Sequence, residues 1–471
     1  MTFKDKWDLL FEDIRFREKT PTISSDGRNP FENDYGRLIS SSPIRRLQDK
    51  TQVFPLEQSD YIRTRLTHSL EVSYIASSIG QSIENLLIKK GEIDADKKGF
   101  LSSLLRTSGL VHDLGNPPFG HFGEEAVKKF FQDYFNSPEY HEYEDKVKAT
   151  NQSALPILSE LEKNDFLNFD GNVQTLRILS KLYYFGDEYG YNLTYSTLAS
   201  CIKYPSNSLE GNKGKHTHEI AKRKFGYFVT ETETFNEINK YLKLNNKRSP
   251  IVYLMEAADD IAYSAADIED GIKLNIVNIY DVRDIFRENL TTNKDIVLAK
   301  LNELIEEYKN NKIDESIVIQ KFRIFTQKIM IQNIIETFDS KYDLIMTGKL
   351  EDEIIDVSNA NDIRKAYKEL QYKVFDDKNI LKKEIAGWEA IYGLIRILVK
   401  ASRSENFKIN GNTYEARIFK LISSSHRFVY ENIEKYSNNE YKKLQMITDF
   451  ISGMTDTYAI NLYQELKGIK L

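Results

Sequence analysis

The chain has 471 residues, and its 65 Lys and Arg against 71 Asp and Glu give a formal net charge of −6. This length allows a large core and more than one lobe, whereas the mild acidity argues against a protein that coats nucleic acid. The single cysteine, Cys201, excludes an internal disulfide framework and is expected to be a free structural thiol in a reducing compartment.

The N-terminal segment is charged throughout and lacks the apolar centre of a signal peptide. No uncharged apolar run approaches the roughly 20 residues that a membrane helix needs. We therefore expect a soluble cytoplasmic protein that has no membrane partner.

In the first half of the chain, the apolar spacing predicts helices with short polar connections. A possible extended piece or small hairpin covers 224–232, and polar loops are expected at 136–152 and 203–218. The helices are expected at 69–89, 100–112, 121–135, 172–185 and 251–269.

The second half predicts helix after helix. All ten prolines lie at or before Pro250, and proline disrupts helix interiors because it lacks an N–H and clashes with the preceding turn. The fold class is therefore all-α (mainly α), with at most a small β-hairpin. Helices are expected at 296–312, 316–337, 362–374, 389–402 and 440–466.

Two histidines occupy helix ends where they can act as metal ligands. His68, in RTRLTHSLEV, is expected to open a helix with Thr67 as its N-cap. His112 and Asp113, in LVHDLG, are expected to close another helix, with Gly115 turning left-handed. Neighbouring residues within a helix diverge by about 100 degrees, so the end of a helix is where such a pair can converge on one ion.

A third segment supplies the remaining ligand. In MEAADDIAYSAADIEDG, Asp259, Tyr263 and Asp267 recur every four residues and share one helix face, whereas Asp260 points elsewhere. His68, His112, Asp113 and Asp259 together form a set of two imidazoles and two carboxylates for one divalent ion. Each motif alone is more often structural, and it is their joint presence that favours a metal site.

The flanking segments extend this pattern. The order of the ligands resembles that of the HD-domain metal-dependent phosphohydrolases, and the flanks are similar to those of the deoxyguanosinetriphosphate triphosphohydrolases. The similar segments are RRLQDKTQVFPL (45–56), RTRLTHSLEV (63–72), HDLGNPPFGHFGE (112–124), DGNVQTLRIL (170–179), KFGYF (224–228), MEAADDIAYSAADIEDG (255–271) and SGMTDTYA (452–459).

The resemblance implies an HD-domain helical core with an additional helical C-terminal lobe. Residues 1–60 would contribute to a nucleotide site, 61–275 would form the catalytic core, and 276–471 would form the C-terminal region. It also implies hydrolysis of a deoxynucleoside triphosphate (dNTP), with dGTP favoured, to a deoxynucleoside and inorganic triphosphate. The divalent ion is expected to be Mn or Mg, and the donor set also suits Fe, Co, Ni or Zn.

His121 and Glu124 are three residues apart, so they are neighbours on the first turn of a helix. We expect His121 to be the general acid that protonates the 5′ oxygen of the leaving sugar, with Glu124 orienting the ring and raising its pKa. An in-line nucleophilic role for His121 is the mechanistic alternative, and a simple helix cap is the structural one.

Several other side chains are expected to bind substrate by resemblance. Tyr263 and Asp267 would contact sugar and phosphate, with the tyrosine ring excluding a ribose hydroxyl. Gln48 would hydrogen-bond near the sugar and base. The cations Arg65, Lys203 and Lys224 would meet the triphosphate. For the base, Arg427 and Glu415 are candidates, although an ordinary helix surface is the favoured interpretation of both.

The resemblance further implies a homo-oligomer, with a hexamer favoured, and a nucleotide or single-stranded DNA effector. Two other functions stay open at this point. One is an HD phosphodiesterase acting on a cyclic nucleotide or nucleic acid, and the other is a non-catalytic nucleotide or single-stranded DNA sensor on the same fold.

Overall fold

The residues that the structure describes fold into helices without a sheet, so the all-α class is confirmed. The computed structural model describes residues 1–17, 27–57, 59–151, 155–183, 187–212, 217 and 219–469. Within these ranges the only β-type pairing is an isolated bridge between Thr51 and Thr64. None of the helices in these ranges combines the length and apolar character needed to cross a bilayer.

The first half of the chain contains twelve α-helices within the described residues. They are α1 (Phe3–Leu10), α2 (Pro30–Ile39), α3 (Ser42–Arg46), α4 (Arg65–Lys90), α5 (Phe100–Val111), α6 (Gly120–Phe135), α7 (Pro138–Asn151), α8 (Glu160–Leu167), α9 (Gly171–Arg177), α10 (Tyr195–Ser200), α11 (Thr232–Tyr241) and α12 (Pro250–Lys273).

Three expectations for this half need correction. The loop expected at 136–152 is mostly α7, because Pro138 is the first helical residue, where its missing N–H costs nothing. The segment 224–232, expected to be an extended piece or a small hairpin, forms no hairpin, and a 3₁₀ turn at Val229–Glu231 leads into α11. The helix expected at 172–185 is α9 followed by a π turn at Ile178–Leu182, and 184–185 lie outside the described residues, as do 152, 213–216 and 218 of the two expected loops.

The second half contains ten further α-helices among the described residues. The single helix expected at 440–466 is two, because the chain breaks at Gly453 and Thr455 caps a new helix by accepting from the Tyr458 amide. The ten are α13 (Ile279–Asn289), α14 (Lys294–Lys309), α15 (Glu315–Ser340), α16 (Tyr342–Met346), α17 (Asn361–Phe375), α18 (Lys378–Ser402), α19 (Tyr414–Leu421), α20 (Ser424–Phe428), α21 (Asn439–Ser452) and α22 (Asp456–Leu466).

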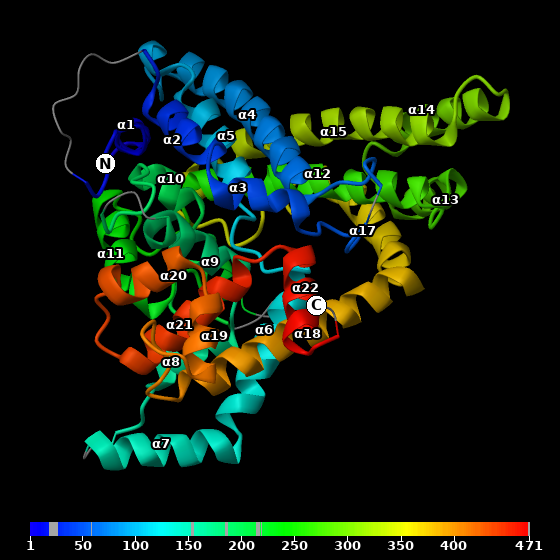
Figure 1. The fold of residues 1–471 in the computed structure, drawn as a ribbon. Helices are drawn as coiled ribbons and strands as arrows, with labels where there is room; N and C mark the ends of the chain where they lie inside the picture. The colour runs from blue at the N-terminus through cyan, green and yellow to red at the C-terminus, as the bar shows by residue number, and fades with distance from the viewer. Residues whose placement is uncertain are drawn as a thin grey trace.

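The first apolar core is built around α12. This helix is buried on nearly every side and packs against α4, α5, α15 and α17 (Figure 1). A helix that is apolar almost all round is stable only inside such a bundle. The acidic side chains of α12 are therefore carried into the interior, where each needs a cationic or hydrogen-bonding partner.

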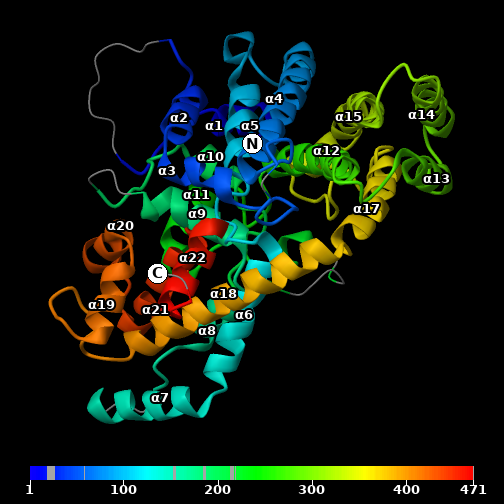
Figure 2. The same cartoon turned by 45° about the vertical axis from the view of Figure 1, so that its right-hand side comes forward.

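The second apolar core lies around α18, which packs against α6, α21 and α22 (Figure 2). Phe130 and Phe131 of α6 share this core with Ile391 and Leu394 of α18. The helix that carries His121 therefore rests on the C-terminal part of the chain. The division of the chain at residue 275 stays a prediction.

A buried ion cluster joins the two parts. Arg177, at the end of α9, pairs with Glu231 at 2.9 Å, with Glu434 at 3.2 Å and with Asp449 at 2.8 Å. All four side chains are buried, so the guanidinium compensates carboxylates that would otherwise be costly to bury.

We expect Arg177→Met to lower the free energy of unfolding by about 3–5 kcal/mol, because it leaves Asp449 without its cation and Glu231 and Glu434 with only Lys181, at 3.6 Å. Denaturant titration measures the change. As a control, Arg287→Met removes an arginine whose side chain is 57% exposed and should stay within about 0.5 kcal/mol of the parent protein. Equal effects of the two substitutions would contradict the structural role of the cluster.

Candidate functional site

Three helices bring His68, His112 and Asp259 together. His68 lies in the first turn of α4, His112 caps the C-terminal end of α5, and Asp259 lies within α12. The Asp259 Oδ1 atom is 3.1 Å from His68 Nε2 and 3.4 Å from His112 Nε2. One ligand atom from each residue lies within 4.8 Å of the others, so the trio can hold a metal ion.

The orientation of the His112 ring suits a metal ligand. Its Nδ1 lies 2.8 Å from the Gly109 carbonyl oxygen, a distance that assigns the proton to Nδ1. Its Nε2 is buried and has no hydrogen-bond partner. Because the Gly109 carbonyl oxygen holds the proton on Nδ1, the Nε2 lone pair is free to bind a metal ion. Metal-binding histidines are commonly fixed in one tautomer by such a partner.

Asp113 lies beside this trio. Its Oδ2 atom is 3.6 Å from His112 Nε2, and the same carboxylate pairs with Arg65. Arg65 also donates from Nε and Nη2 to the Thr51 carbonyl oxygen, at 3.1 and 2.7 Å. The arginine expected to bind phosphate is thus held next to the metal trio and oriented by a backbone group.

The charges at the trio favour a cation. Burial lowers the pKa of His112, but Asp113 and Asp259 outweigh burial and raise it. Burial raises the pKa of Asp259, but His112 and His68 outweigh burial and hold the pKa well below its usual range. Asp259 therefore remains ionised and His112 attracts a proton, so a divalent ion would meet a negative field.

Local details differ from the sequence-based expectations. The N-cap of α4 is Thr64, not Thr67, because the Thr64 hydroxyl accepts from the Thr67 amide. Gly115 is not left-handed; a Cβ atom there would lie 2.2 Å from the Gly171 carbonyl oxygen of α9, so the glycine is needed for close packing.

The two faces of α12 separate the acidic side chains. Asp259 faces the histidines, whereas Asp260 lies 3.4 Å from Arg364 of α17, as the helical spacing predicts. Asp267 accepts from Gln371 of α17 at 2.9 Å, so it faces the same helix as Asp260 and does not share the face of Asp259 on which the sequence places it. Burial and the neighbouring Asp270 raise the pKa of Asp267 to about 8. Burial and Asp260 also raise the pKa of the Tyr263 phenol.

His121 and Glu124 are in contact on the first turn of α6. The His121 Nδ1 atom is 2.9 Å from Glu124 Oε2, and the other carboxylate oxygen accepts from the Gly171 amide at 2.8 Å. Glu124 is buried, whereas the His121 side chain is 88% exposed. Glu124 raises the pKa of His121 by its hydrogen bond and by its charge. The imidazolium form is therefore favoured on a ring that substrate can reach.

The remaining cations differ in their surroundings. Burial lowers the pKa of Lys203, but Asp259 and Glu256 outweigh it and raise the pKa, so Lys203 lies in the field of the metal trio. Lys224 pairs with Asp170. The positive charges of Lys224 and Arg65 lower the pKa of His121, so both cations lie near that ring.

Other candidates lie away from the trio or have surface partners. Gln48 is exposed and accepts from the Thr64 hydroxyl at 3.4 Å, beside the start of α4. Arg427 donates to carbonyl oxygens of α19, at Phe419 and Lys420. Glu415 lies in a groove between α18, α19 and α22. Cys201 is buried, and burial raises its pKa to about 12, which fits a structural thiol.

Sequence reasoning assigned no role to Lys50, Gln371 or Asp456, although all three make buried hydrogen bonds near the site. Lys50 donates to the Asn116 and Ser452 carbonyl oxygens, and Asp456 accepts from the Phe119 amide. Asp456 lies in the segment SGMTDTYA, which resembles the family but to which the sequence assigns no role. Its partner is 337 positions away, so no local spacing identifies it.

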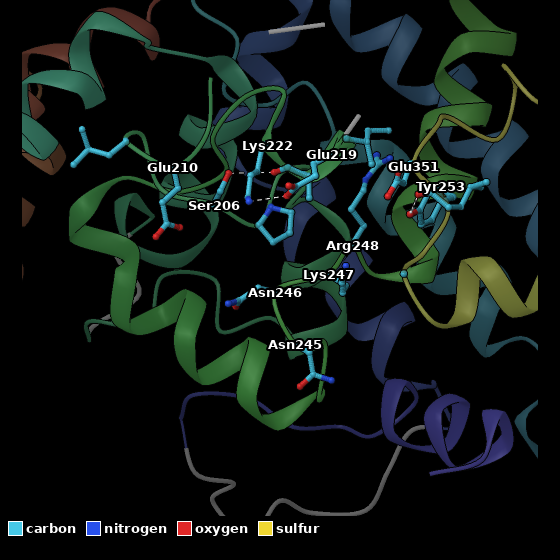
Figure 3. A pocket seen from close by; sticks show the side chains of 16 residues that line it. Ser206, Glu210, Glu219, Lys222, Asn245, Asn246, Lys247, Arg248, Tyr253 and Glu351 are labelled. Atoms are coloured by element: carbon cyan, nitrogen blue, oxygen red, sulfur yellow. Dashed lines mark hydrogen bonds and ion pairs between the residues drawn. The ribbon is translucent and has the colours of Figure 1, made fainter. Parts of the chain in front are cut away.

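A separate cavity of about 690 Å³ opens beside the start of α12 (Figure 3). Ser206, Lys222, Asn246 and Arg248 are among its lining residues, and none of the metal trio is. Arg248 pairs with Glu256, one turn before Asp259. The cavity is therefore next to the helix that carries Asp259 but does not contain the proposed chemistry.

Comparison with known families matches two parts of the chain. The HD domain matches residues 65–170, and the phosphohydrolase-associated domain matches residues 373–465. The first match spans His68, His112 and Asp113, whereas the second covers most of α18 to α22, of which α18 packs against α6. An HD domain with these side chains indicates a metal-binding hydrolase.

Full-length relatives extend this match. Deoxyguanosinetriphosphate triphosphohydrolase-like proteins from Listeria monocytogenes and Listeria innocua are 40% and 41% identical to the chain, over 98% of its length and all of theirs. A protein of the same name from Synechocystis is 30% identical over 99% of the chain and all of its own length. The chain therefore belongs to the deoxyguanosinetriphosphate triphosphohydrolase-like family of HD-domain hydrolases.

Proposed function

We propose that the protein hydrolyses deoxynucleoside triphosphates at the α-phosphorus, with dGTP favoured, and releases a deoxynucleoside and inorganic triphosphate. The observation that carries this proposal is the position of the His121–Glu124 pair on the helix that directly follows the turn after His112 and Asp113. A phosphoryl transfer to water needs an activated water on one side of phosphorus and an acid for the leaving oxygen on the other. The printed name of the relatives supports the nucleotide class.

The residues that would hold the ion are His68, His112, Asp113 and Asp259. When bound, a divalent ion there supplies polarisation of a phosphoryl oxygen and acidification of a water. Mn or Mg is proposed first, because two of the four ligands are carboxylates, and Fe, Co, Ni and Zn also suit the donor set.

His121 is proposed as the general acid. As water adds to the α-phosphorus and loses a proton to solvent, the bond from phosphorus to the 5′ oxygen breaks, and His121 gives its proton to that oxygen. His121 then regains a proton from solvent. Glu124 keeps the ring protonated and oriented, because both of its oxygens are held by partners, His121 Nδ1 and the Gly171 amide.

Six side chains are proposed to bind the substrate. Arg65, Lys203 and Lys224 would neutralise the triphosphate, and each lies in the field of the metal trio or of His121. Tyr263, one turn after Asp259, and Asp267, which accepts from Gln371 of α17, would contact the sugar and phosphate, with the tyrosine ring excluding a ribose hydroxyl. Gln48 would hydrogen-bond near the sugar and base.

The protein is further proposed to act in the cytoplasm as a homo-oligomer, with a hexamer favoured. A nucleotide or single-stranded DNA effector is part of the same proposal. Light scattering of the purified protein measures the assembly, and a monomer of about 55 kDa at micromolar concentration would contradict it.

The reaction is tested by incubating the protein with each of the four dNTPs and with GTP, in Mn or Mg, and separating the products by chromatography. We expect deoxynucleoside and triphosphate in equal amounts, and slower cleavage of GTP by about a hundredfold from packing alone. A nucleoside monophosphate product would instead indicate a phosphodiesterase or pyrophosphatase. Binding without any turnover would indicate a sensor.

The metal ligands are tested by two neighbouring substitutions on α12. We expect Asp259→Asn to weaken metal binding by more than about 100-fold. Replacing a residue that only hydrogen-bonds to a metal ligand already lowers metal affinity about 10- to 100-fold. Asp260→Asn is the matched control, since Asp260 faces Arg364 and should leave the affinity unchanged. Calorimetric titration with Mn measures both, and the reverse order of effects would refute the assignment.

The role of His121 is tested by the dependence of kcat on pH. We expect His121→Asn to lower kcat by about 10²- to 10⁴-fold. In the parent enzyme, kcat should fall as the pH rises through the pKa of His121, because the acid loses its proton. Glu124→Gln removes the charge that raises this pKa and should move that fall to lower pH. An unchanged profile in His121→Asn would contradict the acid role.

A further inference from the structure

The turn at 116–119 links the end of α5, with its metal-side residues, to α6, with His121. Phe119 in this turn has φ +61°, in the left-handed region that a bulky residue rarely adopts. Such a conformation persists only when the surrounding structure holds it, and it recurs at functional sites. The contacts of Phe119 therefore show what holds the turn.

The first contact comes from the start of α22. The Phe119 amide donates to Asp456 Oδ1 at 3.0 Å. The other oxygen of Asp456 accepts from the Thr51 amide at 2.9 Å and from the Thr51 hydroxyl. The Asp456 residue is 2% exposed, so this carboxylate satisfies three donors away from water.

The second contact comes from α18. A Cβ atom at Gly387 would lie 2.4 Å from the ring of Phe119, so the ring rests directly on the glycine. Phe119 itself is buried in the second apolar core. A side chain at 387 would therefore have to displace the ring, the turn or both.

The third contact ties the turn to the segment before α4. Lys50 donates to the Asn116 carbonyl oxygen at 2.6 Å and to the Ser452 carbonyl oxygen at 2.7 Å. Thr51, the next residue, orients Arg65 through its carbonyl oxygen. Three distant segments, at 50–51, 116–119 and 452–456, thus meet at the base of the site.

We propose that Asp456 and Gly387 are positioning residues for the general acid. By holding the turn at 116–119, they set where α6 begins, one residue before His121, and so fix the distance from His121 to the metal trio. The C-terminal region is on this account a working part of the active site. The inference rests on the proposed acid role of His121.

The physical reason is the sensitivity of proton transfer to distance. A misplacement of about 1 Å by a change far from the reacting atoms costs on the order of 10²-fold in rate. Both contacts act on the residue just before α6, and Glu124 moves with His121 because they share a helical turn. A displaced turn would therefore leave the His121–Glu124 pair intact but misplaced.

The test compares Asp456→Ala and Gly387→Ala with the control Gly393→Ala, which lies on α18 as Gly387 does. A Cβ atom at Gly393 would lie 2.2 Å from the Tyr463 ring, which is only partly buried and lies at the surface groove, so it can swing aside. We expect the first two variants to lower kcat on the order of 10²-fold with little change in KM, and the control to keep the parent kcat.

Two readouts separate positioning from stability. The fall of kcat at high pH should vanish in Asp456→Ala, as in His121→Asn. The double variant should have a kcat no lower than that of His121→Asn alone, because both substitutions act through the same ring. Asp456→Asn keeps one acceptor for the Phe119 amide, so its kcat should be intermediate. Full kcat in Asp456→Ala and Gly387→Ala below their melting temperatures, or losses that multiply with His121→Asn, would overturn the proposal.

A measurement without substrate keeps this inference distinct from the proposed function. In protein with ¹³C-labelled histidine, the ring signal missing from His121→Asn identifies that residue. The signal should shift in Asp456→Ala and Gly387→Ala but not in Gly393→Ala. Unchanged signals in all three refute the positioning role, whereas shifted signals in a protein that cleaves no dNTP refute only the proposed reaction.

Discussion

The rest of the structure depends on burying carboxylates next to cations. Asp259 is carried inside by a helix that is buried on almost every side, and it is stable there because His68 and His112 face it. The same requirement recurs at Asp260 with Arg364, and at Arg177 with its three carboxylates. Where such partners are imidazoles rather than guanidinium groups, the cluster can exchange protons for a metal ion. The metal trio is therefore the one ion cluster of this kind, within the described residues, that is suited to chemistry as well as to stability.

Residue types and local spacing predicted the parts of the site that lie on one element. The helical period directs Asp260 about 100 degrees away from Asp259, toward Arg364, and the spacing of three places Glu124 against His121. The all-α class followed from the proline distribution. The approach of His68 to Asp259, 191 positions apart, came from the resemblance and the ligand types, because no local rule brings those residues together.

Local rules failed where tertiary contacts decided the outcome. Two threonines, Thr64 and Thr67, satisfy the capping pattern, and the choice between them is settled by the bridge from Thr51 to Thr64 and by the packing of α4. The sequence predicts a left-handed conformation at Gly115, whereas glycine is needed there because the backbone of α9 leaves no room for a side chain. Pro138 begins a helix because the first helical residue needs no N–H donor, so proline is tolerated there although it disrupts helix interiors. The partner of Phe119 is equally invisible to any short window of sequence.

The position of Asp456 in the chain bears on how the protein is made. Ribosomes deliver a chain from its first residue onward, and early domains fold while later ones are still being synthesised. The Phe119 amide, however, meets its acceptor only after residue 456 of 471 has emerged. A truncated or half-translated product would carry the histidines and acids of the N-terminal half and yet lack the support beneath α6. The metal trio is thus synthesised well before the acceptor for the Phe119 amide, so the order of synthesis separates assembly of the trio from support of α6.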